Sequence, residues 1–258
     1  MSISRKELLE FTNKFADKSG SILQKNYLKN FDIQKKLDGS FVTNIDKEIE
    51  SLFRKLLKKS YPSHGVLGEE FGGQNLDAEY LWIIDPLDGT HSFISGKPLF
   101  GTLISCTKEN VPFIGLIDIP IMKQRWIGGI GAGVFFNGRK CQNIKIKNSL
   151  KDSIVSSTST LMFDTKDSLK VKEIYQKTRF PIFGTDCYAY GLLLLGKIDL
   201  IVEANLKPWD FMAQIPLIKE LGGNISDWKG KKLDIHSDGK VIASMNNNHH
   251  KKLINFLK

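Results

Sequence analysis

The sequence feature that most constrains the fold is an apolar run that ends abruptly in two acids, in the segment WIIDPLDGTHSF at residues 82–93. A short apolar run bounded by turn residues predicts a buried strand. Asp85 and Asp88 end this run with Pro86 between them, and a glycine and a threonine come next. Two carboxylates at the mouth of a buried strand destabilise a fold unless their charge is compensated. The segment therefore points to a function rather than to stability alone.

The composition indicates a soluble globular protein. The chain of 258 residues is long enough to bury a substantial core, and 41% apolar with 25% charged residues is an ordinary balance. No apolar run reaches the length of a membrane span, and the N-terminal residues lack the apolar stretch of a signal peptide. The cysteines at 106, 141 and 187 are odd in number and far apart, which favours free thiols in a reducing compartment. We therefore expect a cytoplasmic protein with no membrane partner.

The net charge of +9 does not identify a partner by itself. A basic surface attracts nucleic acids and small phosphate esters alike. The lysine pairs at 35–36, 58–59, 231–232 and 251–252 are scattered, and none is interleaved with aromatic residues as on a nucleic-acid platform. We interpret them as parts of a solvated surface and expect no nucleic-acid partner.

Two helices followed by short strands are predicted for the first half of the chain. Ser4 with Glu7, and Thr43 with Asp46, have the spacing of capping boxes, and apolar residues at helical spacing follow each pair. The dipeptide Asn-Gly at 137–138 is a strong hairpin signal. Short strands separated by turns are predicted at residues 80–84, 101–106, 113–118, 125–128 and 134–136.

Strands and helices alternate in the second half of the chain. Helices are predicted at residues 168–177, from about Cys187, and from Asp210 to the glycines at 222–223. Strands are predicted at residues 154–157, 180–183, 198–203, 224–227 and 241–244.

This change in the order of predicted elements indicates a chain that is α+β in its first half and α/β in its second half. We place the α+β half, with an antiparallel sheet, at residues 1–152 and the α/β half at residues 153–258. No linker, repeat or shift in composition separates the two halves. We therefore expect one domain over residues 1–258.

Several acids lie at the ends of predicted elements beside turn residues: Asp46, Glu69-Glu70 in GEEFGG, Asp85, Asp88, and Asp210 in KPWDF. Each has a structural alternative, since Asp46 suits the third position of a helix, Asp210 a helix N-cap, and the others turns or solvated loops. Taken together, they suit a hard cation such as Mg²⁺, which prefers oxygen ligands. Carboxylates packed together without a cation would have raised pKa values and would lower stability. The set predicts metal-assisted transfer of a phosphoryl group to water.

Spacing excludes the competing signatures. A phosphoaspartate phosphatase needs two aspartates separated by one residue, whereas two residues separate Asp85 from Asp88. No cysteine has the downstream arginine of a cysteine phosphatase, and no loop has the acid pattern of an EF-hand. The segment GLLLLGKI at 191–198 lacks the Ser or Thr that a P-loop requires, and its leucines suit a buried helix. The adjacent histidines at 249–250 lack zinc spacing and are expected on a surface helix.

Three motifs, GEE, WIIDPLDGTHSF and KPWDFMAQIPLIKELGG, resemble in order and spacing the signatures of the inositol monophosphatase-like family. The resemblance covers most of the chain, from the first helix to about Gly230. The segments SGKPLFGTLI, GTDCYAYGLLLLGKIDLIVE and LKPWDF are closest to its histidinol-phosphate phosphatase branch, although His91 departs from the Lys or Thr expected there. The resemblance implies a layered αβαβα sandwich of the inositol monophosphatase/fructose bisphosphatase type, a homodimer, and two or three Mg²⁺ ions per active site.

The resemblance also implies a set of metal ligands. By position, Glu69, Asp85 and the carbonyl of Leu87 would bind the first Mg²⁺. Asp85, Asp88 and Asp210 would bind the second. The carboxylates would then be occupied as ligands, so that no phosphoenzyme is needed.

The catalytic residues that the resemblance implies lie beside these ligands. Thr90, hydrogen-bonded to Asp46, would orient the attacking water, and Glu69 would assist. The backbone amides of Gly89 and Thr90 would bind the phosphate. Glu70 is expected to be structural.

Substrate choice must depend on other residues. Glu203, at the end of a predicted strand, resembles the substrate-contacting glutamate of the family. Asp186 stands where inositol phosphatases have a small uncharged residue, and it is interpreted either as a substrate contact or as the N-cap of the next helix. Two acids that face the leaving group suit an alcohol with an amino group and an imidazole, which favours L-histidinol phosphate.

Three alternatives remain open at this point. Inositol monophosphatase or nucleotide 3′-phosphatase activity would use the same chemistry on another phosphate monoester. A non-catalytic protein that binds phosphate esters or metal would not need the pair Thr90 and Asp46. A nucleic-acid binder, suggested by charge alone, would show steep salt dependence.

Overall fold

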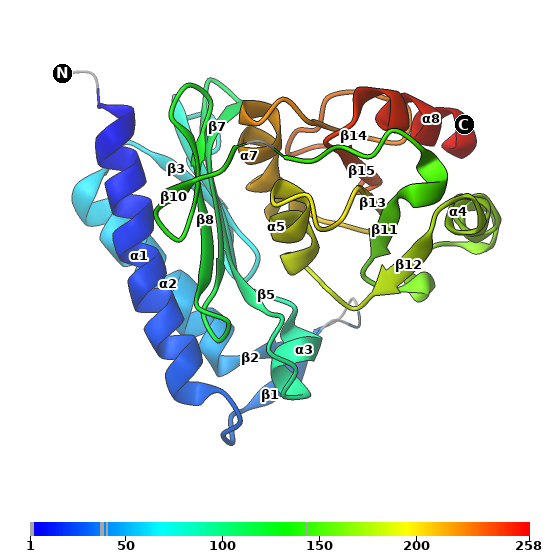
Figure 1. Cartoon of the computed structure of the whole chain (residues 1–258). Coiled ribbons are helices and arrows are strands. Elements are labelled where there is room, and N and C mark those ends of the chain that lie inside the picture. The colour runs from blue at the N-terminus through cyan, green and yellow to red at the C-terminus, as the bar shows by residue number, and fades with distance from the viewer. Residues whose placement is uncertain (1–2, 37–38, 40, 143) are drawn as a thin grey trace.

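The computed structural model describes residues 3–36, 39, 41–142 and 144–258. Figure 1 shows its elements in five layers, in which helices and sheets alternate. The layered αβαβα sandwich that the sequence predicts is confirmed. The helices of the two outer layers are α1 (Arg5–Asn26) and α2 (Asn44–Ser60) on one side, and α4 (Thr165–Lys177) and α8 (Asn247–Leu257) on the other.

Helices α1 and α2 begin at the capping boxes that the sequence predicts. The Glu7 carboxylate accepts the N–H of Ser4 at 2.8 Å, and the Ser4 hydroxyl accepts the N–H of Glu7 at 3.2 Å. At α2 the carboxylate of Asp46 accepts the N–H of Thr43 at 2.8 Å. The two bonds of a capping box satisfy backbone donors that have no partner inside the helix. The cap thereby places Asp46 within the first turn of α2.

The larger sheet follows the first outer helix layer. Its strands are antiparallel except for the parallel pair β3 and β5, a difference from the fully antiparallel sheet that we predicted. Its order across the sheet is β10 (Arg139–Lys140), β9 (Gly133–Phe136), β8 (Gln124–Gly129), β7 (Val111–Ile119), β6 (Gly101–Lys108), β5 (Tyr80–Asp88), β3 (Gly65–Gly68) and β4 (Gly72–Gln74).

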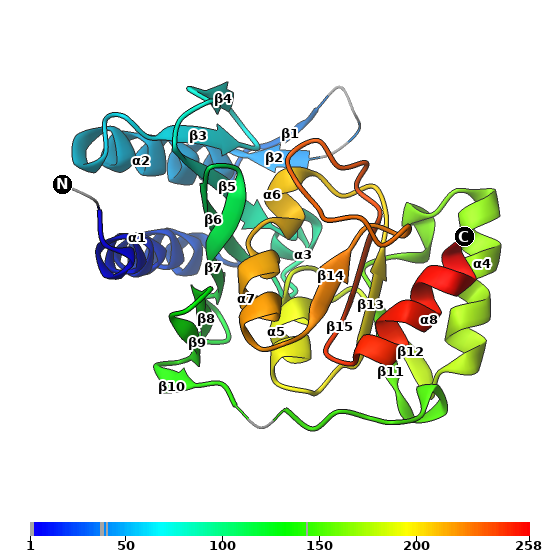
Figure 2. The ribbon, with the colours of Figure 1, turned by 90° about the horizontal axis from the view of Figure 1, so that it is seen from above.

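The smaller sheet has two parallel pairs, β11 with β12 and β11 with β13, and two antiparallel pairs, β13 with β15 and β14 with β15. Its order is β12 (Phe180–Phe183), β11 (Ile154–Ser157), β13 (Leu200–Glu203), β15 (Val241–Ser244) and β14 (Asn224–Ser226). The short helices α5 (Tyr188–Leu194), α6 (Pro208–Phe211) and α7 (Gln214–Glu220) lie between the two sheets, as Figure 2 shows. Helix α3 (Thr90–Ile94) directly follows β5.

The sequence did not predict several short elements. A two-stranded sheet of β1 (Ile33–Lys35) and β2 (Phe41–Thr43) precedes α2, and β3 and β4 flank the acids at 69–70. Each of these strands has only three or four residues, which is too short for a periodic pattern.

One hydrophobic cluster joins the two halves of the chain. It contains Leu103 and Ile117 of the larger sheet, Ile201 and Ala243 of the smaller sheet, and Leu217 of α7 between them. All five side chains are fully buried. Among the described residues, none of the helices combines the length and the apolarity that crossing a bilayer requires.

Candidate active site

A β-bulge near the end of β5 brings Asp85 and Asp88 together. Asp85 lies opposite Leu103 and Asp88 opposite Gly101, so three steps along β5 match two steps along β6. In a regular strand, side chains three residues apart point to opposite faces of the sheet. The additional residue re-aims the strand end, so that carboxylate oxygens of Asp85, Asp88 and Asp210 lie within 4.8 Å of one another. These three residues form the acid cluster.

Asp210 reaches the acid cluster from helix α6. It lies at the third position of this helix, and its Oδ2 accepts the N–H of Lys207 at 2.7 Å. The alternative of a helix N-cap is wrong, because Lys207 occupies that position. The carboxylate bonds back to the N-cap backbone from one turn inside the helix, which fixes its direction.

Glu69 lies in the turn between β3 and β4 and lines the same cavity as the acid cluster. Its Oε1 accepts a hydrogen bond from the Lys36 ammonium at 2.8 Å, and Oε1 of Glu70 accepts another at 2.7 Å. Burial lowers the pKa of Lys36, but the hydrogen bonds to the two glutamates outweigh this effect and raise it. The interpretation of Lys36 as a solvated surface lysine is therefore wrong. The role of Lys36 depends on its ion pairs with residues that are 33 and 34 positions away in the chain, and no local sequence pattern indicates such a pairing.

Thr90 lies between two oxygen acceptors. Its hydroxyl is 3.1 Å from the carbonyl oxygen of Leu87 and 3.5 Å from Oδ1 of Asp46. Burial raises the pKa of Asp46 to about 6, while its hydrogen bonds to Thr43 act in the opposite direction. The sequence predicts this pairing of Thr90 with Asp46, and the two side chains are brought together across 44 residues.

Gly89 allows the chain to turn from β5 into α3. It has φ of 78°, in the left-handed region that favours glycine. A Cβ atom at this position would lie 3.2 Å from Oδ2 of Asp186. Glycine therefore permits both the turn and the close approach of Asp186.

Asp186 and Glu203 line the same cavity as the acid cluster. Oδ2 of Asp186 accepts the hydroxyl of Ser92 at 2.6 Å. The alternative of Asp186 as a helix N-cap is wrong, because Cys187 occupies that position and Asp186 has φ of 45°. Glu203 ends strand β13, is 2% exposed and accepts the hydroxyl of Tyr190 at 2.8 Å. Burial raises the pKa of both carboxyl groups.

The electrostatics of the acid cluster call for a cation. Burial and the neighbouring carboxylates raise the pKa of Asp85 and of Asp210 well above their usual range, and they raise the pKa of Asp88 to about 7. Like charges at this distance cannot all ionise in a buried site without compensation. The donors are oxygen atoms only, as Mg²⁺ prefers. The residues therefore fit a divalent hard cation.

The cavity that contains these groups has a volume of about 320 Å³. Every site residue that the sequence predicts lines it except Asp46, which lies behind Thr90. The sequence did not predict the remaining lining residues, which are Phe41, His91, Thr158, Met162, Cys187, Tyr190, Asn205 and Leu206.

A sequence model of the inositol monophosphatase family matches residues 4–258. The chain belongs to the inositol monophosphatase family. Members of this family are metal-dependent phosphatases, and the acid cluster gives this chain the carboxylates to bind metal.

Individual relatives carry different names. The bifunctional phosphatase IMPL2 of Arabidopsis thaliana is 39% identical over 90% of this chain and 67% of its own length. The histidinol-phosphatase of Chlorobaculum parvum is 30% identical over 92% of each protein. The structure of an inositol monophosphatase from Zymomonas mobilis superposes with a TM-score of 0.88 at 32% identity over 99% of both chains. The family is thus established, and these names leave the substrate open.

We expect Mg²⁺ to raise the melting temperature, and to raise it more at about pH 8 than at about pH 5. The raised pKa values of Asp88 (about 7) and Asp46 (about 6) mean that the metal-free folded protein binds more protons than the unfolded chain between about pH 4 and 7. Its stability therefore falls as pH rises through that window. Mg²⁺ at 100 times its Kd would add about 2.7 kcal/mol, or roughly 5–10 °C.

Differential scanning fluorimetry with Mg²⁺ or with EDTA measures this shift across the pH range. Asp118 is a matched reference, because burial also raises the pKa of its carboxyl group but it lies outside the acid cluster. Asp118→Asn should leave the Mg²⁺ shift unchanged. A Mg²⁺ shift that is equal at both pH values would contradict the assignment of the acid cluster as a cation site.

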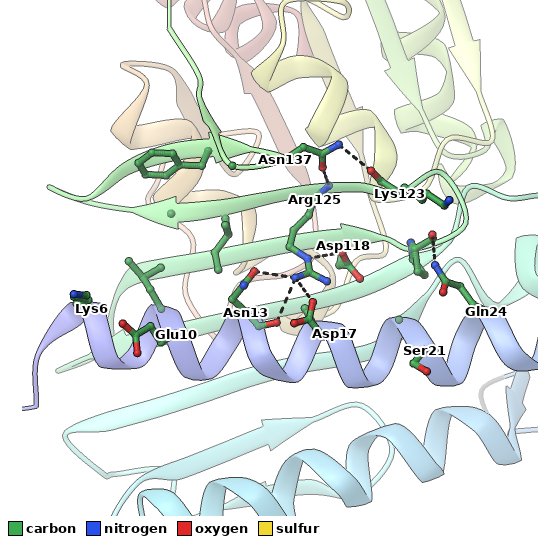
Figure 3. A pocket seen from close by; sticks show the side chains of 18 residues that line it. Lys6, Glu10, Asn13, Asp17, Ser21, Gln24, Asp118, Lys123, Arg125 and Asn137 are labelled. Atoms are coloured by element: carbon green, nitrogen blue, oxygen red, sulfur yellow. Dashed lines mark hydrogen bonds and ion pairs between the residues drawn. The ribbon is translucent and has the colours of Figure 1, made fainter.

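A larger cavity, about 740 Å³, lies away from this site between α1 and strands β7 to β9 (Figure 3). Arg125 crosses it and pairs with Asp118 and Asp17, both at 2.7 Å, and its guanidinium also donates to the Asn13 side chain at 2.8 Å. These bonds connect α1 to β8. We assign Arg125 a structural role in this family member.

Proposed function

We propose that this chain is a Mg²⁺-dependent phosphate monoester hydrolase that acts on L-histidinol phosphate and releases L-histidinol and phosphate. One observation carries the choice of substrate: Asp186 and Glu203 line the same cavity as the acid cluster. Charged hydrogen bonds from carboxylates suit an amino group and an imidazole, whereas a polyol requires neutral hydrogen bonds. The similarity to the histidinol-phosphatase of Chlorobaculum parvum supports the same substrate.

The family resemblance implies the metal ligands, and the proximity of the acids in one cavity supports them. Glu69, Asp85 and the Leu87 carbonyl would bind one Mg²⁺, and Asp85, Asp88 and Asp210 would bind a second. The N–H of Cys187 donates to Oδ2 of Asp88 at 2.8 Å, which orients that carboxylate. When bound, the metal would offset negative charge on the phosphoryl group and the leaving oxygen and would promote ionisation of the attacking water.

Thr90 and Asp46 would act on that water. Above about pH 6 the carboxylate of Asp46 is ionised, because burial raises its pKa to about 6. It can then accept a hydrogen bond from the Thr90 hydroxyl, which leaves the Thr90 oxygen free to accept a hydrogen bond from water and to orient it. Glu69, which lines the same cavity, would assist. The backbone amides of Gly89 and Thr90, at the start of α3, would bind the phosphate oxygens.

Inositol monophosphate is the second candidate substrate, because the Zymomonas mobilis structure named as an inositol monophosphatase superposes over nearly the whole chain. A nucleotide 3′-phosphate would use the same chemistry. Both lack the protonated amino group that Asp186 would bind. Substrate comparison in a single variant therefore separates them from L-histidinol phosphate.

We expect Asp186→Asn to act selectively on substrates. The amide keeps an oxygen that accepts from Ser92, but it loses the charge that would pair with the amino group of L-histidinol phosphate. A charge-assisted hydrogen bond contributes roughly 1.5–3 kcal/mol, or about 10- to 150-fold in kcat/KM. Glycerol phosphate cannot make this contact, so its kcat/KM should change little.

The measurement is phosphate release from both substrates by wild type and by Asp186→Asn. The loss in kcat/KM for L-histidinol phosphate, divided by the loss for glycerol phosphate, gives a ratio in which general damage to the protein cancels. A ratio near one would remove the main argument for L-histidinol phosphate and would favour a monoester without an amino group, such as inositol phosphate.

We further propose that residues 1–258 form one phosphatase domain, that it binds two or three Mg²⁺ ions, and that it works as a cytoplasmic homodimer. Exposed apolar side chains support a dimer. Phe180 and Phe183 on the edge strand β12 are 43% and 44% exposed, and Leu161 is 91% exposed. Apolar groups on an edge strand are stabilised when another surface covers them.

A further inference from the structure

Helix α2 contains a buried carboxylate that is not one of the site acids. Glu50 lies one turn after Asp46 and is fully buried. A buried charge is costly unless it is paired and hydrogen-bonded. The Glu50 carboxylate meets this requirement through a loop 20 residues away: Oε2 accepts the N–H of Glu70 at 2.7 Å, and Oε1 accepts the N–H of Phe71 at 3.2 Å.

Arg54 completes the contact between α2 and this loop. Its Nε donates to Oε1 of Glu50 at 2.9 Å, one helical turn away, and its guanidinium also donates to the carbonyl oxygen of Gly72. The side chains of Glu50 and Arg54 thus bind backbone groups in the turn between β3 and β4 and at the start of β4. Figure 2 shows α2 beside these two strands.

Gly68 shows how closely the carboxylate approaches the loop. A Cβ atom at Gly68 would lie 2.1 Å from Oε1 of Glu50 and 2.3 Å from its carboxyl carbon. Real Cβ atoms do not approach other atoms so closely. No side chain fits at Gly68 while the Glu50 carboxylate is in its observed position. This explains why the first residue of the GEE motif is a glycine.

The loop needs such a restraint because it presents Glu69 to other acids. Repulsion from Glu69 is among the causes that raise the pKa of Asp85, Asp46 and Asp210. The same repulsion pushes Glu69 away from the acid cluster whenever no cation compensates it. Backbone hydrogen bonds to a buried carboxylate oppose that movement without adding a ligand.

We infer that Glu50 is a positioning residue that places Glu69 for metal binding, an inference that rests on the proposed metal-dependent function. Glu50 and Asp46 lie four residues apart on α2, so one rigid helix sets the position of the Glu69 loop and of the carboxylate behind Thr90. Residues that orient metal ligands without touching the metal typically change affinity or activity by about 10- to 100-fold when substituted.

The test is Glu50→Gln, studied by calorimetric titration with Mn²⁺ and by the Mg²⁺ dependence of phosphate release. The glutamine amide keeps the shape of Glu50, but its NH₂ group cannot accept the backbone donor that faces it. We expect the Kd for Mn²⁺ and the Mg²⁺ concentration for half-maximal rate to rise about 10- to 100-fold. The kcat at saturating Mg²⁺ should stay within about threefold of wild type, because no transition-state contact is removed.

Phe53→Leu is the matched control. Phe53 lies on the same helix, is fully buried and packs against Phe15 and Trp82, so the change loosens the core without touching the loop. Its metal affinity should equal that of wild type. Gly68→Ala provides a second route if Glu50→Gln does not fold, because its methyl group displaces the Glu50 carboxylate and keeps the charge; it should weaken Mn²⁺ binding in the same way.

Wild-type metal affinity in Glu50→Gln, or an equal loss in Phe53→Leu, would overturn the role of Glu50 and leave the proposed function standing. If Glu50→Gln does not fold, wild-type affinity in Gly68→Ala would have the same meaning. A wild-type protein that binds no Mn²⁺ would overturn the proposed function together with this inference.

Discussion

Asp85→Asn is expected to lower kcat/KM by about 10³-fold or more. Asp85 is 2% exposed at the end of β5, and its carboxylate lies within 4.8 Å of those of Asp88 and Asp210, where it would bind both metal ions. A bound metal contributes several kcal/mol of transition-state stabilisation, and each 1.4 kcal/mol is about tenfold in rate. Steady-state phosphate release at several Mg²⁺ concentrations measures the loss.

Glu70→Gln is the control for that substitution. Glu70 is the neighbour of a proposed ligand, but its carboxylate faces Lys36 at 2.7 Å and does not line the cavity. Burial raises its pKa to about 7, so a neutral glutamine is a small change near neutral pH. We expect a loss below about tenfold. Equal losses in Asp85→Asn and Glu70→Gln would contradict the ligand assignment.

Metal-free Asp85→Asn should also be at least as stable as the metal-free wild type. Burial and three neighbouring carboxylates raise the pKa of Asp85, so its removal relieves repulsion in the absence of a cation. Thermal unfolding in EDTA measures this. A strongly destabilised variant would show that Asp85 is a structural residue.

Thr90→Ala is expected to lower kcat by about 10²- to 10⁴-fold with little change in metal affinity. The Thr90 hydroxyl lies 3.5 Å from Asp46, and positioning of a proton donor or acceptor in the transition state contributes an effect of this size. Pre-steady-state and steady-state phosphate release give kcat, and calorimetric titration with Mg²⁺ gives the affinity. Thr90→Ser keeps the hydroxyl and should retain most of the activity.

A loss of Mg²⁺ binding in Thr90→Ala would contradict this assignment. Thr90 also lies 3.1 Å from the carbonyl oxygen of Leu87, a proposed metal ligand, so a structural role for the hydroxyl would appear as weaker metal binding. The two measurements therefore distinguish orientation of the water from support of the ligand.

Local signals in the sequence predicted much of this fold. The capping boxes at Ser4 and Thr43 start their helices as expected, because both partners lie within one turn of each other. The hairpin at 137–138 is also confirmed, with φ of 46° at Asn137 and 77° at Gly138. Caps and turns depend on a few neighbouring residues, so a sequence specifies them directly.

Features that depend on partners far along the chain were not predicted. The bulge between Asp85 and Asp88 is defined by register with β6, and the pairing of Lys36 with Glu69 joins segments 33 residues apart. His249 and His250, expected on a surface helix, are 1% and 6% exposed because the inner face of α8 packs on the smaller sheet.

In the candidate site, too, some features were predicted from the sequence and others depend on packing. The identities of Asp85, Asp88 and Asp210 follow from oxygen chemistry and from their positions at element ends, and the structure brings them together. Of the two alternatives for Asp186, the helix cap is wrong, because a left-handed backbone at this residue turns its carboxylate toward Ser92. Backbone conformation of that kind is set by packing around the cavity, not by the local sequence.

Phosphate release from a panel of monoesters, with Mg²⁺ and with EDTA, tests the central claim most directly. The panel contains L-histidinol phosphate, inositol 1-phosphate, a nucleotide 3′-phosphate and glycerol phosphate. We expect release only with Mg²⁺, and a kcat/KM for L-histidinol phosphate at least about tenfold above the others, as one charged contact would give. No release from any monoester with Mg²⁺, or a preference for inositol 1-phosphate, would contradict the account.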